Sequence, residues 1–213
     1  LIQGRLRLLR EQAGYDAAFL VDPGGTLLLS PEGDATGRLP APESRALSRG
    51  FSLAQPATVE PRRDPVFAFP FFSLLAPVYA DDEPVAAVWM AVDVRASLYP
   101  LLEKWPSASR TAESALVVLE DDHARVLSPL RDRPDAAPNL RIPLARADDP
   151  MVRAVTGMRG LFYAHDYRGQ PVIAMASSMT GSPWYLVSKI DTQEALTSRW
   201  RELLRIAAPI AAG

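Results

Sequence analysis

Hydrophobic and polar residues alternate along the first half of the chain in segments that predict β-strands. The stretch "AAFLVDPGGTLLLSP" has apolar runs at 17–22 and 26–30 on either side of "DPGG". Proline fixes one φ angle and glycine accepts positive φ, so this stretch predicts a β-hairpin. Further strands are expected near 67–79 and 85–92, around the turn "ADDEP", after a proline-rich segment (31–65) that shows no clear period and is expected to be irregular.

The second half repeats this order of elements. Its pattern predicts a short helix near 150–157 after an irregular stretch at 129–150. The strands expected here are 115–119, 124–128, 160–166, 171–179 and 184–190. Because hairpin connections dominate both halves, each sheet should be antiparallel with helices on one side, which is the α+β class.

Two distant pairs of segments match at one offset, which indicates an internal duplication. Ser30-Pro31 and Ser128-Pro129 are 98 residues apart, and Asp93 and Asp191 are separated by the same distance along the chain. A repeat of this length is too long for a solenoid unit and suits one small domain. The chain is therefore expected to contain two related modules.

Each copy is expected to close with a helix. The first, at about 94–104, should stop at Pro106. In the second copy, Asp191 and Glu194 form a D-x-x-E arrangement in which Asp191 can accept from early helix amides while Glu194 reaches back to the cap. The apolar stripe of this second helix would consist of Leu196, Trp200, Leu203, Leu204 and Ala207.

Composition argues against several classes of function. The 213 residues carry a net charge of −2, without the basic face that a nucleic-acid binder needs. The absence of cysteine excludes disulfides and thiolate metal sites. No run of about 18 apolar residues forms a complete membrane span, although the start at Leu1 and the ending "LLRIAAPIAAG" suggest a segment cut from a longer protein.

Few residues suggest catalysis. His123 and His165 are far apart and lack the spacing of a metal site, and no nucleotide-binding loop or nucleophile elbow is present. The acidic clusters, such as Glu120-Asp121-Asp122, lie at predicted turns, where charge is usually solvated. The sequence therefore favours a protein that is not an enzyme and holds no cofactor and no metal.

The second copy also resembles a protein family. Its stretches "TAESALV" (111–117), "DYRGQPV" (166–172) and "SPWYLVSKID" (182–191) are similar to the double Cache, or tandem PAS-like, sensor regions of bacterial membrane receptors. The resemblance covers about residues 15–200 and is weaker in the first half. It implies two modules, each an antiparallel sheet of about five strands flanked by helices, followed by a transmembrane helix and a histidine kinase or diguanylate cyclase output.

The resemblance also implies a division of the chain and a location. It would consist of a shortened N-terminal helix (1–14), a membrane-distal module (15–106), a membrane-proximal module (107–196) and a C-terminal helix (197–213) leading toward a membrane span. The chain would then be the periplasmic part of an inner-membrane protein, attached through flanking helices. Dimerisation through the N-terminal helices is expected in the intact receptor.

The most specific motif has a structural interpretation. Gly169 and Pro171 fall at a predicted hairpin turn, beside which Asp166 could pair with Arg168 or cap the turn. Trp184 and Tyr185 point to opposite faces of one strand, so one should be core and the other rim. Together with Asp191, these residues are expected to be structural.

Candidate ligand-binding residues come from the first copy. In the family, amino-acid binders use an R-x-W-Y motif, then Tyr-x-Asp, then an Asp at the end of the last strand. This sequence keeps only the final Asp, as Asp93. Asp93 also has a structural interpretation as a helix cap. Arg62 and Arg63 could clamp a carboxylate, although adjacent arginines are more often solvated. Alternating residues on one strand face, together with Trp89 on the neighbouring strand, are expected to form an apolar wall. Such a wall is more often plain core, but it could also line a pocket for a small molecule. The residues on the first strand are Phe67, Phe69, Phe71, Ser73 and Tyr79.

Three functional hypotheses follow. The first is an extracytoplasmic sensor that binds an unknown small molecule, with a carboxylate as one option, in the distal module and transmits a shift through the C-terminal helix. The second is a PAS-like protein-interaction module without a small ligand. The third is a module whose distal pocket is filled by its own aromatic residues.

Overall fold

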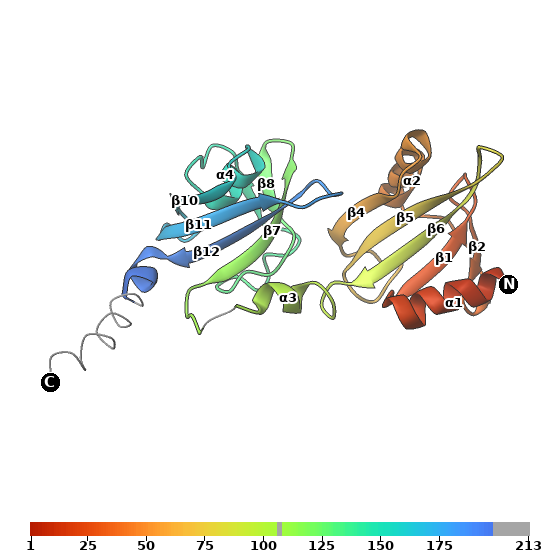
Figure 1. The fold of residues 1–213 in the computed structure, drawn as a ribbon, viewed down its shortest axis with the longest axis horizontal. Coiled ribbons are helices and arrows are strands. Elements are labelled where there is room, and N and C mark those ends of the chain that lie inside the picture. The colour runs from red at the N-terminus through yellow and green to blue at the C-terminus, as the bar shows by residue number, and fades with distance from the viewer. Residues whose placement is uncertain (106–107, 198–213) are drawn as a thin grey trace, which may run out of the picture. The chain divides into compact units, whose positions relative to one another are not determined.

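The computed structural model describes residues 1–105 and 108–197, which form two compact units. The first comprises Leu1–Leu98 and the second begins at Tyr99. We call them the N-terminal and C-terminal modules. Each consists of a six-stranded antiparallel sheet with helices packed against it (Figure 1). The predicted α+β class is confirmed, and each sheet has one strand more than expected.

The sheet of the N-terminal module has the order β3-β2-β1-β6-β5-β4. Its first strand, β1, pairs along its length with its last strand, β6. The elements of this module are α1 (Ile2–Ala13), β1 (Ala17–Val21), β2 (Leu27–Ser30), β3 (Gly33–Asp34), α2 (Ala41–Leu53), β4 (Ala57–Arg62), β5 (Phe71–Ala80) and β6 (Glu83–Asp93).

The first hairpin forms where the sequence predicts it. Gly25 in the turn between β1 and β2 has a φ of 82°, which glycine adopts without the steric cost of a Cβ. The Asp22 side chain accepts a hydrogen bond of 2.7 Å from the Thr26 amide and so closes the turn. Local turn chemistry therefore fixes the register of this pair.

The segment expected to be irregular, residues 31–65, contains a helix and two strands. The buried positions of α2 are Glu43, Ala46, Leu47 and Gly50, which follow helical spacing. A charged residue and a glycine occupy two of these four core positions, so the apolar period is not visible in the sequence. The expectation of an irregular segment was wrong for this reason.

The strand expected near 67–79 begins later than predicted. β5 begins at Phe71, so Phe67 and Phe69 precede the strand and do not alternate along it. The "DPVFAFP" segment forms turns instead, with the Phe67 amide donating to the Asp64 carbonyl at 3.2 Å. Pro65 and Pro70 lack the amide hydrogens that a strand ladder requires.

The sheet of the C-terminal module has the order β10-β11-β12-β7-β8-β9. As in the N-terminal module, its first long strand pairs with its last, which agrees with a duplication. The elements are α3 (Tyr99–Glu103), β7 (Glu113–Glu120), β8 (His123–Val126), β9 (Arg141–Pro143), α4 (Pro150–Val155), β10 (Gly160–His165), β11 (Pro171–Ser178) and β12 (Trp184–Asp191).

Two predictions in this half need correction. The helix expected at 94–104 is only α3, because residues 94–98 form a turn in which the Asp93 carbonyl accepts from the Ala96 and Ser97 amides. The irregular stretch at 129–150 contains the short strand β9, which adds the sixth strand of the sheet. Pro106 and the stripe beyond Thr197 lie outside the described residues.

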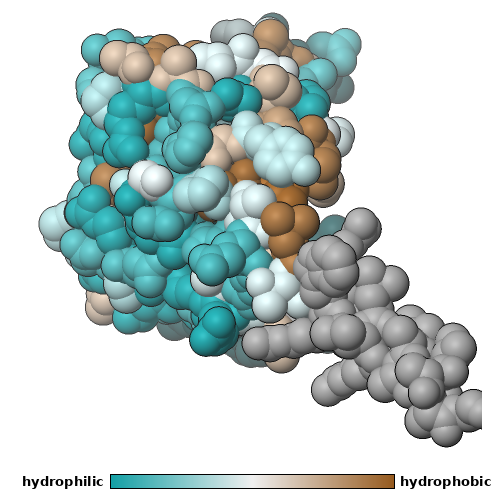
Figure 2. Space-filling model, turned by 90° about the vertical axis from the view of Figure 1, so that its left-hand side faces the viewer, coloured by the Kyte–Doolittle hydropathy of each residue, from teal (hydrophilic) through white to brown (hydrophobic). Residues whose placement is uncertain are grey.

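Strands β10 and β11 of the C-terminal module have one covered and one open face. Phe162 and Ala174 are buried in the core under α4, whereas Leu161, Tyr163 and Met175 on the same strands are exposed. The surface seen in Figure 2 is mostly hydrophilic, with hydrophobic residues gathered along one margin. The period of two thus separates a core face from an open face.

Among the described residues, no helix is long and apolar enough to cross a membrane.

We expect α1 to be held on its sheet chiefly by Leu6, which is 2% exposed and packs with Ala18 and Met90. Replacing Leu6 with Ala should lower the free energy of unfolding of the N-terminal module by about 2–3 kcal/mol in urea denaturation, because a buried side chain is removed. Leu8→Ala is the matched control, since Leu8 is 48% exposed. Equal losses in the two variants would contradict this packing.

Candidate functional site

A chain of buried polar groups lies between α2 and the sheet of the N-terminal module. Glu43 on α2 and Ser73 on β5 are both fully buried, and Ser73 Oγ donates to Glu43 Oε1 at 2.9 Å. Trp89 on β6 is also fully buried, and its indole Nε1 donates to Ser73 Oγ at 3.1 Å. Three elements thus direct polar atoms to one place inside an otherwise apolar core.

Arg62, the last residue of β4, neutralises the charge of Glu43. Its guanidinium donates to the Glu43 carboxylate and, at 2.6 Å, to Asp64 Oδ2. It also lies 4.9 Å from the centre of the Phe71 ring. The Nε atom of Arg62 is buried and has no hydrogen-bond partner among the described residues. A buried ion pair with an unsatisfied donor stabilises a fold poorly.

Asp64 forms the outer end of this cluster. Burial acts to raise the pKa of Asp64, but hydrogen bonds from Arg62 and from the Val66 amide outweigh it and hold the pKa below its usual range. The carboxylate is therefore charged at neutral pH. Glu43 and Asp64 together place two carboxylates on one guanidinium.

Aromatic rings fill the space beside the cluster. The Phe67 ring lies 4.7 Å from the Phe71 ring, 5.2 Å from the Phe69 ring and 5.5 Å from the Trp89 ring, measured between centroids. Phe19 on β1 stacks on Trp89 at 5.3 Å. Phe67 and Phe69 are half-buried on the turn segment before β5, so they cover the cluster from its solvent side.

The structure brings six of the nine candidate ligand-binding residues together. These are Arg62, Phe67, Phe69, Phe71, Ser73 and Trp89. Arg63 is exposed and takes no part in the ion pairs of that cluster. Tyr79 is 36% exposed, and its hydroxyl donates to the Phe51 carbonyl at 2.9 Å, so it joins the end of β5 to α2.

Asp93 is engaged in a local turn. Its carboxylate accepts from the Arg95 amide at 2.9 Å and from the Arg95 guanidinium at 2.7 Å. These hydrogen bonds from Arg95 are the main reason that the pKa of Asp93 lies below its usual range. Asp93 therefore closes a turn and does not cap a helix, because α3 begins only at Tyr99.

A second buried ionic cluster lies in the C-terminal module. Lys189 on β12 is 2% exposed, and its ammonium lies 2.6 Å from Asp166 Oδ2 and 3.2 Å from Glu113 Oε1. Burial acts to raise the pKa of Asp166, but hydrogen bonds from Lys189 and Arg168 outweigh it and keep the pKa low. Burial and the nearby Glu113 raise the pKa of Tyr167, whose hydroxyl donates to Glu113 at 3.1 Å.

The "DYRGQPV" motif belongs to this cluster. Asp166 both caps the turn, by accepting from the Arg168 and Gln170 amides, and pairs with the Arg168 guanidinium. Gly169 has a φ of 78°, as the turn requires. Arg168 also contacts Asp132 and Asp191, so it ties the turn to the loop after β8 and to the end of β12.

The strand that carries Trp184 has its aromatic residues on opposite faces. Trp184 is 6% exposed, and Tyr185 is half-buried against the core under α4, with the Arg159 guanidinium 4.3 Å from its ring centre. The alternation predicted from sequence is present. Both faces of β12 are thus largely covered at this point.

The D-x-x-E pair does not form the predicted capping box. Asp191 contacts Arg168, and Glu194 accepts from the Ser109 hydroxyl at 3.0 Å and from the Arg110 and Thr111 amides at 2.9 Å each. Hydrogen bonds from Thr111 and Arg110 lower the pKa of Glu194 to about 2. Glu194 therefore attaches the segment after β12 to the segment before β7, a long-range contact that spacing alone cannot show.

The charged residues at the centre of both clusters are not evident from the sequence. Glu43, Glu113 and Lys189 were not singled out, because charged residues are normally read as solvated. The sequence holds one signal for Lys189, because it lies two residues after the apolar Val187 and therefore on the same face of the strand. It is also one of only two lysines in the chain.

Comparison with known proteins shows similarity in structure alone. No family model and no curated protein matches the chain. The ligand-binding domain of the Pseudomonas aeruginosa amino acid chemoreceptor PctB with L-Arg has a TM-score of 0.64 and 18% identity, over 97% of this chain and 78% of that one. The Pseudomonas fluorescens chemoreceptor CtaA with L-alanine has a TM-score of 0.58 and 17% identity, over 92% of both chains.

A sensor kinase domain shows the same similarity. The extracellular domain of mmHK1S-Z2, assigned as a histidine kinase, has a TM-score of 0.65 and 12% identity, over 92% of this chain and 82% of that one. Identities this low establish the fold alone. The double Cache fold that the sequence resemblance implies is therefore confirmed.

We expect the Lys189 cluster to be essential for the C-terminal module. Lys189→Met should lower the free energy of unfolding by about 3–5 kcal/mol, because Asp166 and Glu113 would remain buried without their cation. Urea denaturation measures this change. Lys104→Met, at the other lysine, which is exposed, is the control and should cost less than about 0.5 kcal/mol. A mild effect of Lys189→Met would show that the ammonium is dispensable.

The Glu194 contacts should depend on pH. Its folded pKa of about 2 lies below its ordinary value of 4.5, so the stabilisation is complete above pH 4.5 and is lost as the pH falls toward 2. Hydrogen exchange of the Arg110 and Thr111 amides should be about tenfold faster in Glu194→Ala than in the parent at pH 6. The ratio between the two proteins should shrink as the pH falls. Gln193→Ala, at an exposed neighbour, should leave exchange unchanged at every pH.

Proposed function

We propose that this chain is the extracytoplasmic sensing region of a bacterial membrane receptor and that its N-terminal module binds a small carboxylate-bearing molecule. The fold supports the general role, because the similar structures are ligand-binding and extracellular domains of receptors. The observation that carries the specific proposal is the half-buried Arg62 side chain, whose buried Nε donor is unsatisfied beside the fully buried Glu43.

A ligand would exchange with interactions that the module now makes with itself. A carboxylate can accept two parallel hydrogen bonds from a guanidinium, including one from Nε. Entry of such a ligand would replace Asp64 on Arg62. An α-amino acid also brings an ammonium group, which Glu43 and Asp64 could then accept. With an amino acid, the displaced carboxylate would gain the ligand ammonium as a partner, so no charge is left unpaired.

The turn segment that carries Phe67 and Phe69 is the element that would move. It covers the cluster and is held by turn hydrogen bonds that Asp64 accepts, such as the 3.1 Å bond from the Val66 amide to Asp64 Oδ1. Displacement of Asp64 would release these bonds at the same time. Binding at Arg62 would thereby favour a second arrangement of this segment, as a sensor requires.

The C-terminal module would carry the change onward. Its last strand ends at Asp191, which Arg168 holds, and Glu194 holds the segment that follows. We assign transmission to the segment from Thr192 onward, with membrane attachment and a kinase or cyclase output in the whole protein. We also propose that the N-terminal module is membrane-distal and that the intact receptor dimerises through α1.

Calorimetric titration with the common L-amino acids and short carboxylates tests the proposal. At least one should bind, and Arg62→Gln should weaken that binding about tenfold or more, because a charge-assisted hydrogen bond is lost. Arg63→Gln is the matched control, since the neighbouring Arg63 is exposed. Arg62→Lys, which keeps the charge but not the bidentate geometry, should give an intermediate affinity.

Two outcomes would contradict the proposal. Absence of heat and of any rise in Tm across the whole panel would favour a module filled by its own aromatic residues, because a ligand at about 100 times its Kd should add about 2.7 kcal/mol of stability. Equal losses in Arg62→Gln and Arg63→Gln would place the ligand away from the cluster.

A further inference from the structure

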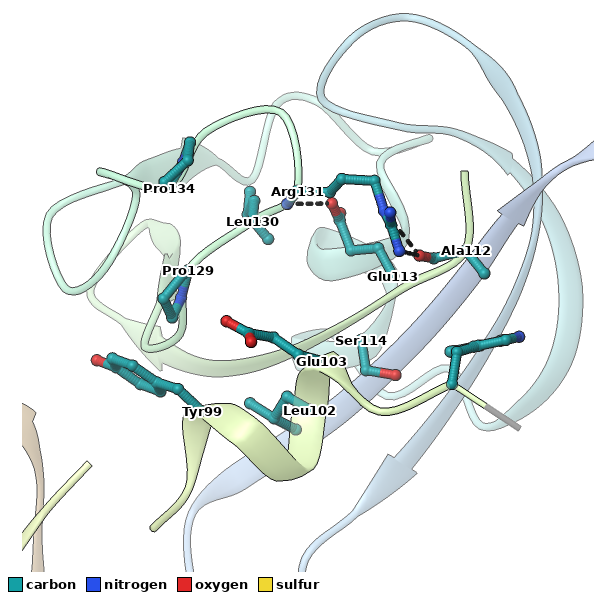
Figure 3. Close-up of a pocket in the computed structure, with 11 residues that line it drawn as sticks. Tyr99, Leu102, Glu103, Ala112, Glu113, Ser114, Pro129, Leu130, Arg131 and Pro134 are labelled. Carbon is teal, nitrogen blue, oxygen red and sulfur yellow. Dashed lines mark hydrogen bonds between the residues drawn. The ribbon is translucent and has the colours of Figure 1, made fainter. Parts of the chain in front are cut away.

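A separate cavity of about 340 Å³ lies in the C-terminal module. It is lined by α3, the start of β7 and the loop that follows β8, and Figure 3 shows the residues that line it. Its size is at the lower end of the range for small-molecule sites, roughly 300–1,000 Å³. None of the residues proposed for ligand binding in the N-terminal module contributes to it.

Two carboxylates line this cavity. Glu103 projects from α3 toward the loop that carries Pro129 and Leu130 (Figure 3), and it makes no hydrogen bond or ion pair within residues 1–105 and 108–197. Glu113 on β7 is only 6% exposed, and its Oε1 atom has no hydrogen-bond partner in this part of the chain. A buried acceptor without a donor is costly unless a ligand supplies one.

The basic groups nearby are already engaged. The Arg131 guanidinium donates twice to the Ala112 carbonyl, at 3.1 and 2.8 Å, and only its backbone amide reaches Glu113 Oε2. Lys189 donates to Asp166 and forms an ion pair with Glu113, 3.2 Å from Oε1, but without the geometry of a hydrogen bond. The cavity therefore presents more negative than positive charge to whatever enters it.

The remaining walls suit an organic molecule. Tyr99 and Trp105 provide aromatic surface, and Leu102, Pro129 and Leu130 provide aliphatic surface. The Tyr99 hydroxyl donates to the Leu127 carbonyl at 3.2 Å, which fixes α3 beside the loop. Aromatic faces attract cations, and the alkyl part of an amine can pack on leucine and proline.

We infer that this cavity binds a small organic cation, a primary amine or a guanidinium compound, between Glu103 and Glu113. A divalent metal ion fits less well, because it requires a shell of several oxygen ligands. Among the described residues, no group of three or more histidine, cysteine or acidic side chains could hold one. Occupation would join α3 to β7 through the ligand, so a cation would stiffen the start of the C-terminal module.

Agmatine, which carries an amine and a guanidinium group, is the probe. Calorimetric titration should detect its binding, and sodium butyrate, an anion of similar chain length, should not bind at this site. In NMR spectra, agmatine should shift the amide signals of Ala112 and Leu130 and leave those of Ser73 and Trp89 in place. Shifts confined to the N-terminal module would place the amine away from this cavity and overturn this inference, without bearing on carboxylate binding at Arg62.

Charge reversal at Glu103 provides the matched variant. Glu103 is exposed, so Glu103→Lys should fold normally and should weaken agmatine binding more than tenfold, since it places a like charge in the cavity. Glu11→Lys, at an exposed helical glutamate of the N-terminal module, makes the same change in net charge and should have no effect. Failure of agmatine to bind the parent protein at millimolar concentration, or equal binding by parent and Glu103→Lys, would overturn the inference.

Discussion

Charges buried against a sheet must be neutralised where they lie, and this constraint organises both modules. In the N-terminal module Arg62 pairs with Glu43 and Asp64, and in the C-terminal module Lys189 and Arg168 pair with Glu113, Asp166, Asp132 and Asp191. In each case the partners come from different strands, loops or helices. The ion pairs therefore fix how those elements meet, at a cost in desolvation that an apolar core would avoid.

The two copies use the same framework for different purposes. Both place their first strand beside their last. The expectation of helices on one side is wrong for the N-terminal module, where α1 and α2 pack on opposite faces of the sheet, whereas α4 packs on one face in the C-terminal module. The N-terminal module surrounds its charges with aromatic rings and leaves one guanidinium donor unsatisfied, whereas the C-terminal module distributes its charges over the "DYRGQPV" turn and the ends of β7 and β12. A site that can exchange partners fits the first arrangement, and a rigid connector fits the second.

Much of the fold could be predicted because its causes are local. Alternation of apolar residues, the "DPGG" turn and the glycine at position 169 identified most strands and two hairpins, and the 98-residue offset identified the duplication. The helix α2 was missed because Glu43 and Gly50 interrupt its apolar stripe. Of the candidate site, the aromatic residues, Ser73 and Arg62 were predicted, but not Glu43, which joins them.

The sequence by itself determined the strands, the order of the elements and the duplicated α+β architecture, because periodicity and turn chemistry act between neighbouring residues. Only the tertiary structure decided which charges are buried and which partners they meet. Glu194 shows the reason: its spacing from Asp191 suggests a helix cap, yet its carboxylate accepts from Ser109, Arg110 and Thr111, more than eighty residues away. A carboxylate accepts hydrogen bonds from whichever donors packing brings within about 3 Å, wherever those donors lie in the chain.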